Sequence, residues 1–218
     1  TAIALARRLG VALDVVATRG QGEAEDAFGD RLAALQRAAL VADVPTEFHR
    51  CDGRHTADEI KAVAREAAAQ LLVLERHGEA KSGTPLDALT QGVLASAPCS
   101  VLLVPAGASL WTRRILVAFD GSPAARAAFD FAVQLAKPGR TPVMLFSVTD
   151  RDGKLPSSIT EEADLALAAA QMENVEAEFR HAGGHIAGAI LAAAAEHGAD
   201  LIVLYRHTRG QLGRGLLG

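Results

Sequence analysis

Cysteine and aromatic residues are scarce in this sequence, and neither sign of charge prevails. Two cysteines, Cys51 and Cys99, occur in 218 residues, which excludes a framework of disulfides and favours a reducing compartment, the cytoplasm. The near-neutral balance, a formal charge of −4, argues against nucleic acid or an anionic membrane as the main partner. No apolar run approaches the roughly 20 residues that a membrane-spanning helix needs, and no signal peptide opens the chain. The composition, half of it apolar, therefore predicts a soluble globular protein.

What the sequence does have is an alternation of apolar strands with amphipathic helices. Short apolar runs such as LLVLE and ILVAF are separated by stretches in which Leu and Ala recur at helical spacing. A chain that alternates strand with helix forms a parallel sheet covered by helices on both faces. The pattern therefore predicts an α/β fold.

The chain repeats itself after about 130 residues, which is the size of a single domain. Two pairs of segments match between the copies. The segment from Thr46, TEFHRCDGRHTADEI, matches the one from Ala177, AEFRHAGGHIAGAI, and AAAQLLVLERH matches HGADLIVLYRH. We expect a first domain at residues 1–106 that lacks its opening strand, and a second at residues 107–218 that lacks its last helix and strand. Because the sequence begins without Met and ends within the repeat, we expect it to be part of a longer protein.

The second copy opens on a stretch with an unusually clear helix start. A buried strand at residues 115–119 is followed by Asp120 and Gly121, and then by Ser122, which suits a helix N-cap. Pro123 suits the first helical position, where its missing N–H costs nothing. Asp120 thus stands at the carboxyl end of a parallel strand and beside a helix N-terminus, where open α/β sheets bind their ligands.

Three motifs, in this order and with the repeat, resemble the universal stress protein family in its tandem two-domain form. They are ASAPCSVLLVP, ILVAFDGSPAARAAFDFAVQLA and HGADLIVLYRH. The resemblance implies two Rossmann-like units of the adenine nucleotide alpha hydrolase-like type, each a parallel five-stranded sheet with helices on both faces. It also implies pairing through the last strands, so we expect the two domains to pair within the chain, with a homodimer as a further form of self-association.

Some family members bind ATP, with magnesium, and the resemblance implies where. An Asp at the end of the first strand and a Val at the end of the second hold adenine, and these match Asp120 and Val148. A glycine signature holds the ribose and phosphates, because glycine exposes backbone N–H groups to phosphate. The resemblance thus adds two segments of the second copy to the site. The turn after Asp120 supplies Gly121 and Ser122, and the loop after the fourth strand supplies Leu204, Tyr205, Arg206, Thr208, Arg209 and Gly218.

The glycine signature is nevertheless altered in both copies. In the second copy its three glycines fall on Tyr205, Thr208 and Gly218, so only the last is kept. Thr208 is β-branched and resists a left-handed backbone, and Tyr205 places a ring where the family keeps open space. Three arginines of the same loop, Arg206, Arg209 and Arg214, either hold phosphate through their side chains or form a solvated surface.

The first copy departs further from the signature. It keeps Gly78 but has Glu75 at the first glycine and Asp87 or Ala88 at the third. Carboxylates repel phosphate, so we expect this copy to be structural.

The sequence indicates neither a catalytic nor a metal-binding group. It has no Gly-x-Ser-x-Gly elbow, no Ser-His-Asp arrangement and no obvious base for an attacking water. The groups His49, Cys51, His55 and His181, His185 fall short of a zinc set with the usual spacing. We expect a noncatalytic stress-response or regulatory module with at most one degenerate adenine-nucleotide site, in the second domain. The alternatives are a slow ATP hydrolase and a dimerisation scaffold that binds no nucleotide.

Overall fold

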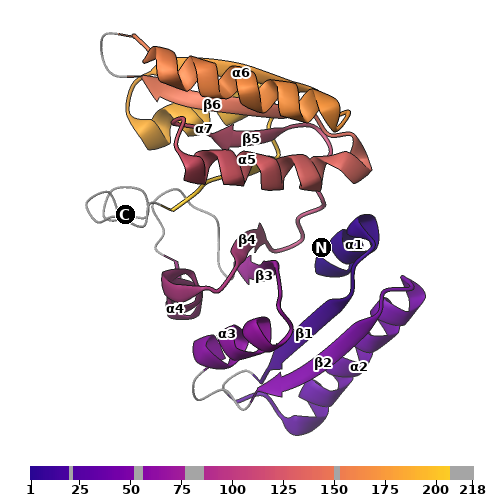
Figure 1. Cartoon of the computed structure of the whole chain (residues 1–218). Coiled ribbons are helices and arrows are strands. Elements are labelled where there is room, and N and C mark those ends of the chain that lie inside the picture. Colours follow the sequence, from indigo (N-terminus) through magenta and orange to yellow (C-terminus); the bar gives the residue numbers. More distant parts are fainter. Residues whose placement is uncertain (20–21, 52–55, 77–85, 150–152, 207–218) are drawn as a thin grey trace. The chain divides into compact units, whose positions relative to one another are not determined.

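The structure is a computed structural model that describes residues 1–19, 22–51, 56–76, 86–149 and 153–206. The chain divides into two compact units, Thr1–Leu110 and Trp111–Gly218. In both units strands alternate with helices and every described strand pair is parallel (Figure 1). This confirms the predicted α/β class.

The second unit holds a four-stranded sheet among its described residues, in the order β7-β6-β5-β8. Its elements are β5 (Ile115–Ala118), α5 (Pro123–Ala136), the 3₁₀ turn η1 (Lys137–Gly139), β6 (Val143–Thr149), α6 (Ser157–Met172), β7 (Ala177–Gly183), α7 (Ile186–Glu196) and β8 (Leu201–Val203). Helices α5 and α6 cover one face of this sheet and α7 covers the other (Figure 1). The chain runs outward from β5 through β6 to β7 and then returns to β8 on the other side of β5. The strand order therefore reverses at β5, which creates a topological switch point there.

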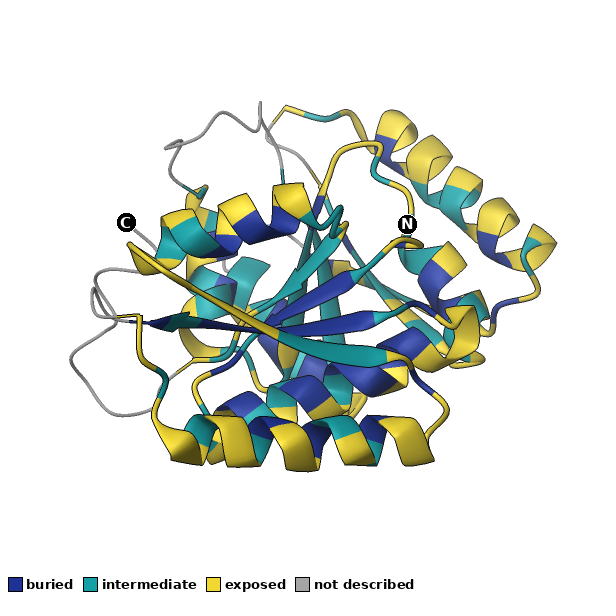
Figure 2. Ribbon diagram, turned by 90° about the horizontal axis from the view of Figure 1, so that it is seen from above, coloured by how far each residue is buried: buried dark blue, intermediate teal, exposed yellow. Residues whose placement is uncertain are grey.

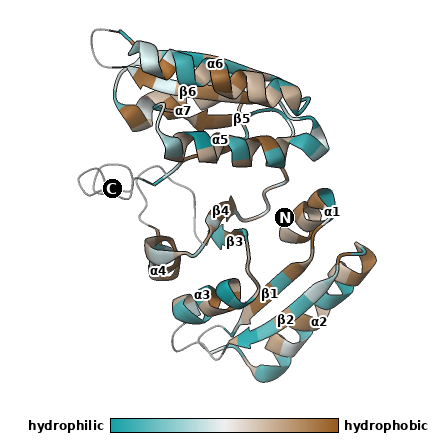
Figure 3. Ribbon diagram, viewed as in Figure 1, coloured by the Kyte–Doolittle hydropathy of each residue, from teal (hydrophilic) through white to brown (hydrophobic). Residues whose placement is uncertain are grey.

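The core of this unit lies around β5 and β6. Ile115, Leu116 and Val117 of β5 are fully buried, as expected for a strand covered on both faces. Figure 2 shows buried strands, in dark blue, beside helices whose outer faces are exposed. Leu116 packs with Met144 of β6 and Ile190 of α7 in one buried cluster. β5 is hydrophobic along its length and β6 over its first four residues (Figure 3). The apolar runs in the sequence are thus explained by burial on two faces.

The side chain of Asp200 ties β8 to β5. Its carboxylate accepts hydrogen bonds from the backbone N–H groups of Thr112 (2.9 Å), Arg113 (3.0 Å) and Arg114 (3.1 Å), directly before β5. Burial raises the pKa of Asp200, but these backbone donors outweigh it, and the pKa lies below its usual value. Asp200 thus holds the two strands at the point where the strand order reverses.

The first unit contains two separate two-stranded sheets, β1-β2 and β3-β4. Its elements are α1 (Ala2–Leu9), β1 (Leu13–Thr18), α2 (Glu25–Val41), β2 (Thr46–Cys51), α3 (Thr56–Glu66), β3 (Leu71–Arg76), α4 (Ala88–Ser96) and β4 (Ser100–Pro105). Helix α2 packs on β2 through Phe28, whose buried ring lies under the guanidinium groups of Arg31 (5.1 Å) and Arg50 (4.9 Å). Helix α3 also packs against β1 and β2.

The sheets of the described residues are therefore more fragmented than the expected five strands in each unit. In the second unit β5 lies between β6 and β8 and joins them into one sheet. The repeat matches β1 with β6 and β3 with β8, but the described residues of the first unit contain no counterpart of β5. Strands β1 and β3 thus lack the strand that would connect them, and each forms a pair with its other neighbour. Whether the sequence is part of a longer protein stays a prediction.

Candidate functional site

The turn after β5 places Asp120 at the carboxyl end of the sheet. The backbone N–H of Ser122 donates to Oδ1 of Asp120 at 2.9 Å, which closes the turn over Gly121. Gly121 has φ +76°, and a Cβ at this position would lie 3.3 Å from Cα of Ile159 in α6. Both the backbone conformation and the close approach of α6 therefore require glycine here.

Helix α5 begins as its sequence predicts. Oγ of Ser122 accepts a hydrogen bond from the N–H of Ala125 at 3.2 Å, and Pro123 occupies the first helical position. The N-terminus of α5, with its partial positive charge, lies next to the Asp120 carboxylate. Asp120 itself is exposed.

Tyr205, just beyond β8, contacts this turn. Its half-buried phenol hydrogen-bonds with the side chains of Asp120 and Ser122. Burial, then the hydrogen bond to Asp120 and its charge, raise the pKa of Tyr205 far above the usual value for tyrosine, and a weaker contact with Ser122 opposes them. The phenol therefore stays protonated at physiological pH and donates to Asp120.

Val148 reaches the same edge of the sheet as Asp120. The last paired residues of β5 and β6 are Ala118 and Phe146. Asp120 lies two positions after Ala118, in the turn that follows β5, and Val148 lies two positions after Phe146 in β6. Val148 is partly buried against the core cluster below α7. The structure thus brings together Asp120, Gly121, Ser122, Val148 and Tyr205.

The remaining candidate residues are less closely gathered. Leu204 and Arg206 follow β8 and are exposed, whereas Thr208, Arg209 and Gly218 lie outside the described residues. The predicted phosphate half of the site is therefore not described.

The corresponding region of the first unit uses its acidic side chain for helix capping. Asp87 is the N-cap of α4 and accepts from the N–H of Thr90 at 2.8 Å and from the hydroxyl of Thr90 at 2.7 Å. The backbone hydrogen bond from Thr90 is the main reason that the pKa of Asp87 lies below its usual value. Glu75 is exposed on β3, and Gly78 lies outside the described residues.

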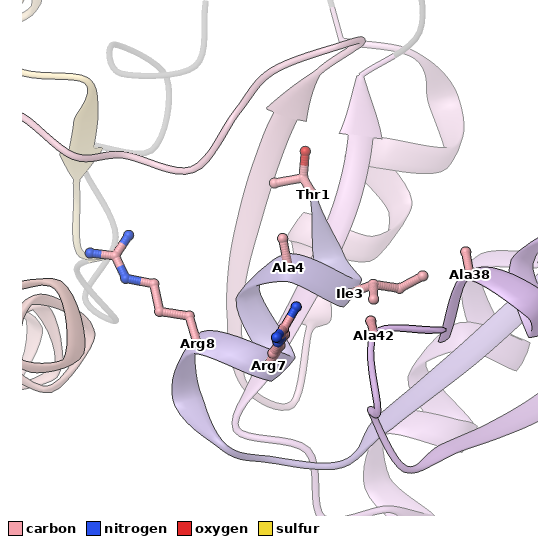
Figure 4. A pocket seen from close by; sticks show the side chains of 7 residues that line it. All are labelled: Thr1, Ile3, Ala4, Arg7, Arg8, Ala38 and Ala42. Atoms are coloured by element: carbon pink, nitrogen blue, oxygen red, sulfur yellow. The ribbon is translucent and has the colours of Figure 1, made fainter. Parts of the chain in front are cut away.

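The first unit contains a hollow of a different kind. A cavity of about 580 Å³ lies between α1 and α2, where Ile3, Ala38 and Ala42 form an apolar wall (Figure 4). Arg7 lines it as well, and the side chain of Arg8 extends away from Ala38 and Ala42 (Figure 4). This cavity is built entirely from residues of the first unit and has no part in the site around Asp120.

Sequence reasoning missed two features of the site. It placed the ring of Tyr205 near the nucleotide position but did not predict the hydrogen bonds of its hydroxyl with Asp120 and Ser122. It also gave no role to Ile159, whose contact with the turn excludes a side chain at Gly121. Neither contact has a local sequence signal, since both partners are distant in the chain.

The model of the universal stress protein family matches residues 1–105 and 112–218. The chain belongs to the universal stress protein family. It is a tandem universal stress protein, with two family domains in one chain. The resemblance inferred from the three motifs is thereby confirmed.

Solved structures that resemble this chain share its fold. A universal stress protein from Archaeoglobus fulgidus DSM 4304 is 19% identical, with a TM-score of 0.72 over 92% of this chain and 79% of that one. A functionally unknown protein from Pseudomonas aeruginosa PAO1 is 18% identical, with a TM-score of 0.63 over 95% of this chain and 76% of that one. At these identities the likeness establishes the fold.

One universal stress protein has been solved in complex with cAMP. It is 24% identical to this chain, with a TM-score of 0.37, and the match covers 43% of this chain and 71% of that one. Among curated proteins no sequence matches this chain significantly. Within the described residues, none of the helices combines the length and the apolar character needed to cross a membrane.

Proposed function

We propose that this tandem universal stress protein is a noncatalytic stress-response module whose second unit retains at most a degenerate adenine-nucleotide site. The observation that supports this is the hydrogen bond between Tyr205 and Asp120. In the family's ATP binders, the carboxylate at this position is available to adenine. Here a side chain of the same chain already donates to it.

The contact with Tyr205 opposes nucleotide binding energetically. A hydrogen bond to a charged group contributes roughly 1.5–3 kcal/mol, and an adenine must break the bond between Tyr205 and Asp120 before it can replace it. Displacing the half-buried ring adds a further cost because its apolar surface returns to water. The competition lowers nucleotide affinity by at least about tenfold relative to a site with a free carboxylate.

Calorimetric titration of ATP, ADP and AMP with magnesium tests the proposal. We expect no saturable binding by the wild type below about millimolar nucleotide, and tighter binding by Tyr205→Phe, which keeps the ring but removes the hydroxyl, by about tenfold or more. Tyr205→Gly restores the family's residue and is expected to bind more tightly still. Adding Asp120→Ala to either Tyr205 variant should abolish the gain in nucleotide affinity.

Two outcomes would change the proposal. Saturable micromolar binding by the wild type that Asp120→Ala abolishes would make the chain a nucleotide sensor. If neither Tyr205 variant binds nucleotide, the proposal of a degenerate site is wrong, and the alternative of a dimerisation scaffold that binds no nucleotide remains.

The slow ATP hydrolase is the second candidate function. Among the described residues at the edge of the second sheet, the acidic group is Asp120, and its hydrogen bonds with Ser122 and Tyr205 leave it poorly suited to act as a base for water. We propose that the protein is not an enzyme. Phosphate release from ATP should not exceed that of a protein-free blank, and a rate above the blank that Asp120→Ala removes would contradict this.

We further propose self-association through the last strands, as the family resemblance implies. In the described residues β4 pairs with β3 on one side only, so its second edge has N–H and C=O groups available for another strand. Neither Cys51 nor Cys99 is in a disulfide, which is consistent with the cytoplasm as the proposed compartment.

A further inference from the structure

Three side chains with metal-binding atoms converge on the paired strands β1 and β2. Asp14 lies opposite Glu47 in the parallel register, and His49 is two residues further along β2. Alternate residues of a strand point to the same face, so all three side chains lie on one face of this sheet. One ligand atom from each lies within 4.8 Å of the others, and Nε2 of His49 is 2.7 Å from Oδ1 of Asp14.

We propose that Asp14, Glu47 and His49 bind a divalent transition-metal ion of the zinc type. Zinc takes carboxylate oxygen and imidazole nitrogen at about 2.0–2.2 Å, often from three side chains with water in the fourth position. Asp14 and Glu47 are exposed and His49 is partly buried, so water can reach the site and supply the remaining ligand. An ion between the three ligand atoms replaces the direct contact between Asp14 and His49.

The second unit shows what the same positions hold when no such cluster is formed. The first pair of β1 and β2 is Leu13 with Thr46, and that of β6 and β7 is Val143 with Ala177. Counting from these pairs, Asp14 corresponds to Met144, Glu47 to Glu178 and His49 to Arg180. Met144 is fully buried in the core, and Glu178 pairs with Arg180 and Arg114.

The first unit therefore replaces an apolar residue by a carboxylate and an arginine by an imidazole. Asp14 is exposed, whereas Met144 is fully buried, and Arg180, the counterpart of His49, is exposed as well. Together the two differences leave an aspartate, a glutamate and a histidine on one face of the strands of the first unit, and all three carry metal-binding atoms.

The cations near the cluster are engaged elsewhere. Arg50, next to His49, points to the opposite face of β2, where it bonds with Glu25 at 2.5 Å and lies over Phe28. Lys61 of α3, the helix that packs on these strands, is held by Asp58 at 2.7 Å and by Ser96 at 3.0 Å. Within the described part of the chain, the ion pair of Asp14 is with His49, and Glu47 forms none. The imidazole thus pairs with one of the two carboxylates beside it, and a divalent ion bound between the three ligand atoms would interact with both carboxylates.

No local pattern in the sequence indicates this site. Cys51 and His55 follow His49 closely in the chain, but these three residues do not have the usual spacing of a zinc set. His55 lies outside the described residues. The partners found in the structure are instead Asp14 and Glu47, and strand pairing brings Asp14 to them from far along the chain. Strand β2 is hydrophilic through much of its length, in contrast to the core strands of the second unit (Figure 3).

The test is titration of the full chain with zinc chloride in a calorimeter. We expect one saturable zinc site per chain, and each of Asp14→Asn, Glu47→Gln and His49→Gln should lower its zinc affinity at least about tenfold. Substituting a residue that only hydrogen-bonds to a metal ligand already lowers metal affinity by about tenfold or more, so the loss of a ligand should cost at least as much. His181→Gln is the matched control. His181 is an exposed histidine on the corresponding strand β7, and its substitution should leave the affinity unchanged.

A second measurement keeps the proposal falsifiable if a variant folds poorly. Cobalt(II) added to the wild type should show visible d–d absorption that zinc displaces, and Glu47→Gln should weaken it while far-ultraviolet circular dichroism stays that of the wild type. A strong thiolate-to-cobalt band that Cys51→Ser removes would place the ion on Cys51 and overturn the proposal. Zinc affinity unchanged in Asp14→Asn and Glu47→Gln, or no saturable binding by the wild type, would overturn it as well.

Discussion

Gly121 occupies a turn that a side chain would strain in two independent ways. Its φ of +76° is unfavourable for any residue with a Cβ, and that Cβ would approach Ile159 of α6 to 3.3 Å. Gly198, which follows α7, shares the positive φ (+66°) but has nothing within 4 Å of its Cβ position. Alanine substitutions at Gly121 and Gly198 therefore distinguish the cost of backbone strain, which both share, from the cost of the steric contact, which only Gly121 has.

We expect Gly121→Ala to lower the free energy of unfolding more than Gly198→Ala does. The left-handed conformation alone costs about 1–2 kcal/mol, and the contact with the backbone of α6 adds a cost of about 1 kcal/mol or more, as overpacking does. Urea unfolding followed by circular dichroism measures both variants. Equal losses of unfolding free energy in the two variants would show that α6 shifts to accommodate the added methyl group at no cost.

Tyr205 and Asp120 show how one contact between two residues changes the meaning of a motif. Asp120 fits the pattern of an adenine-binding carboxylate, yet its carboxylate already accepts a hydrogen bond from Tyr205. Under the proposed function, Tyr205 must be displaced before this carboxylate can recognise adenine.

At the scale of elements, one carboxylate adds to the backbone pairing of β8 with β5. Asp200 accepts from three successive backbone N–H groups before β5, next to the backbone bond from its own N–H to the carbonyl of Arg114. Its side chain is 20% exposed, so water competes weakly with these donors.

We expect Asp200→Asn to lower the free energy of unfolding by about 2 kcal/mol at neutral pH, the scale of a hydrogen bond to a charged group. Because the pKa of Asp200 is lowered in the folded protein, its contribution is fully present above the unfolded pKa of about 4. It is lost as the pH falls through the folded pKa. Urea unfolding from pH 7 down to pH 3 should therefore show the difference between wild type and variant shrinking at the acid end.

Asp130→Asn is the control for this effect. Asp130 forms an exposed ion pair with Arg126 within α5 (3.0 Å), and exposed pairs of this kind contribute little. A loss as large as that of Asp200→Asn would contradict the role given to the backbone donors.

At the scale of the whole molecule, the chain consists of two compact units with their own contacts. The core of the second unit centres on Leu116, Met144 and Ile190. Since a domain has its own hydrophobic core, a change in this cluster should act on the second unit first.

We expect Leu116→Ala to lower the stability of the second unit by about 2–5 kcal/mol, because it leaves a cavity in a fully buried cluster. Native-state hydrogen exchange should show faster exchange at the amides of β6 and β7 and unchanged exchange at those of β1 and β2. An equal loss of protection in β1 and β2 would mean that the two units unfold as one.

The sequence by itself determined the α/β class, the repeat, the family and the turn around Ser122, because each depends on patterns within a few residues or on the order of such patterns. Apolar runs, helical spacing and a capping serine act locally, and the structure confirms them in α5 and β5. The placement of Asp120 at the switch point also followed from local pattern plus the known strand order of such sheets.

Only the tertiary structure decided which distant side chains meet. The contact of Tyr205 with Asp120 depends on β8 returning beside β5, and the cluster of Asp14, Glu47 and His49 depends on the register of β1 with β2. A shift of that register by one residue would turn Glu47 and His49 to the opposite face. Such meetings are set by strand order and register across the sheet, which no stretch of the chain encodes alone.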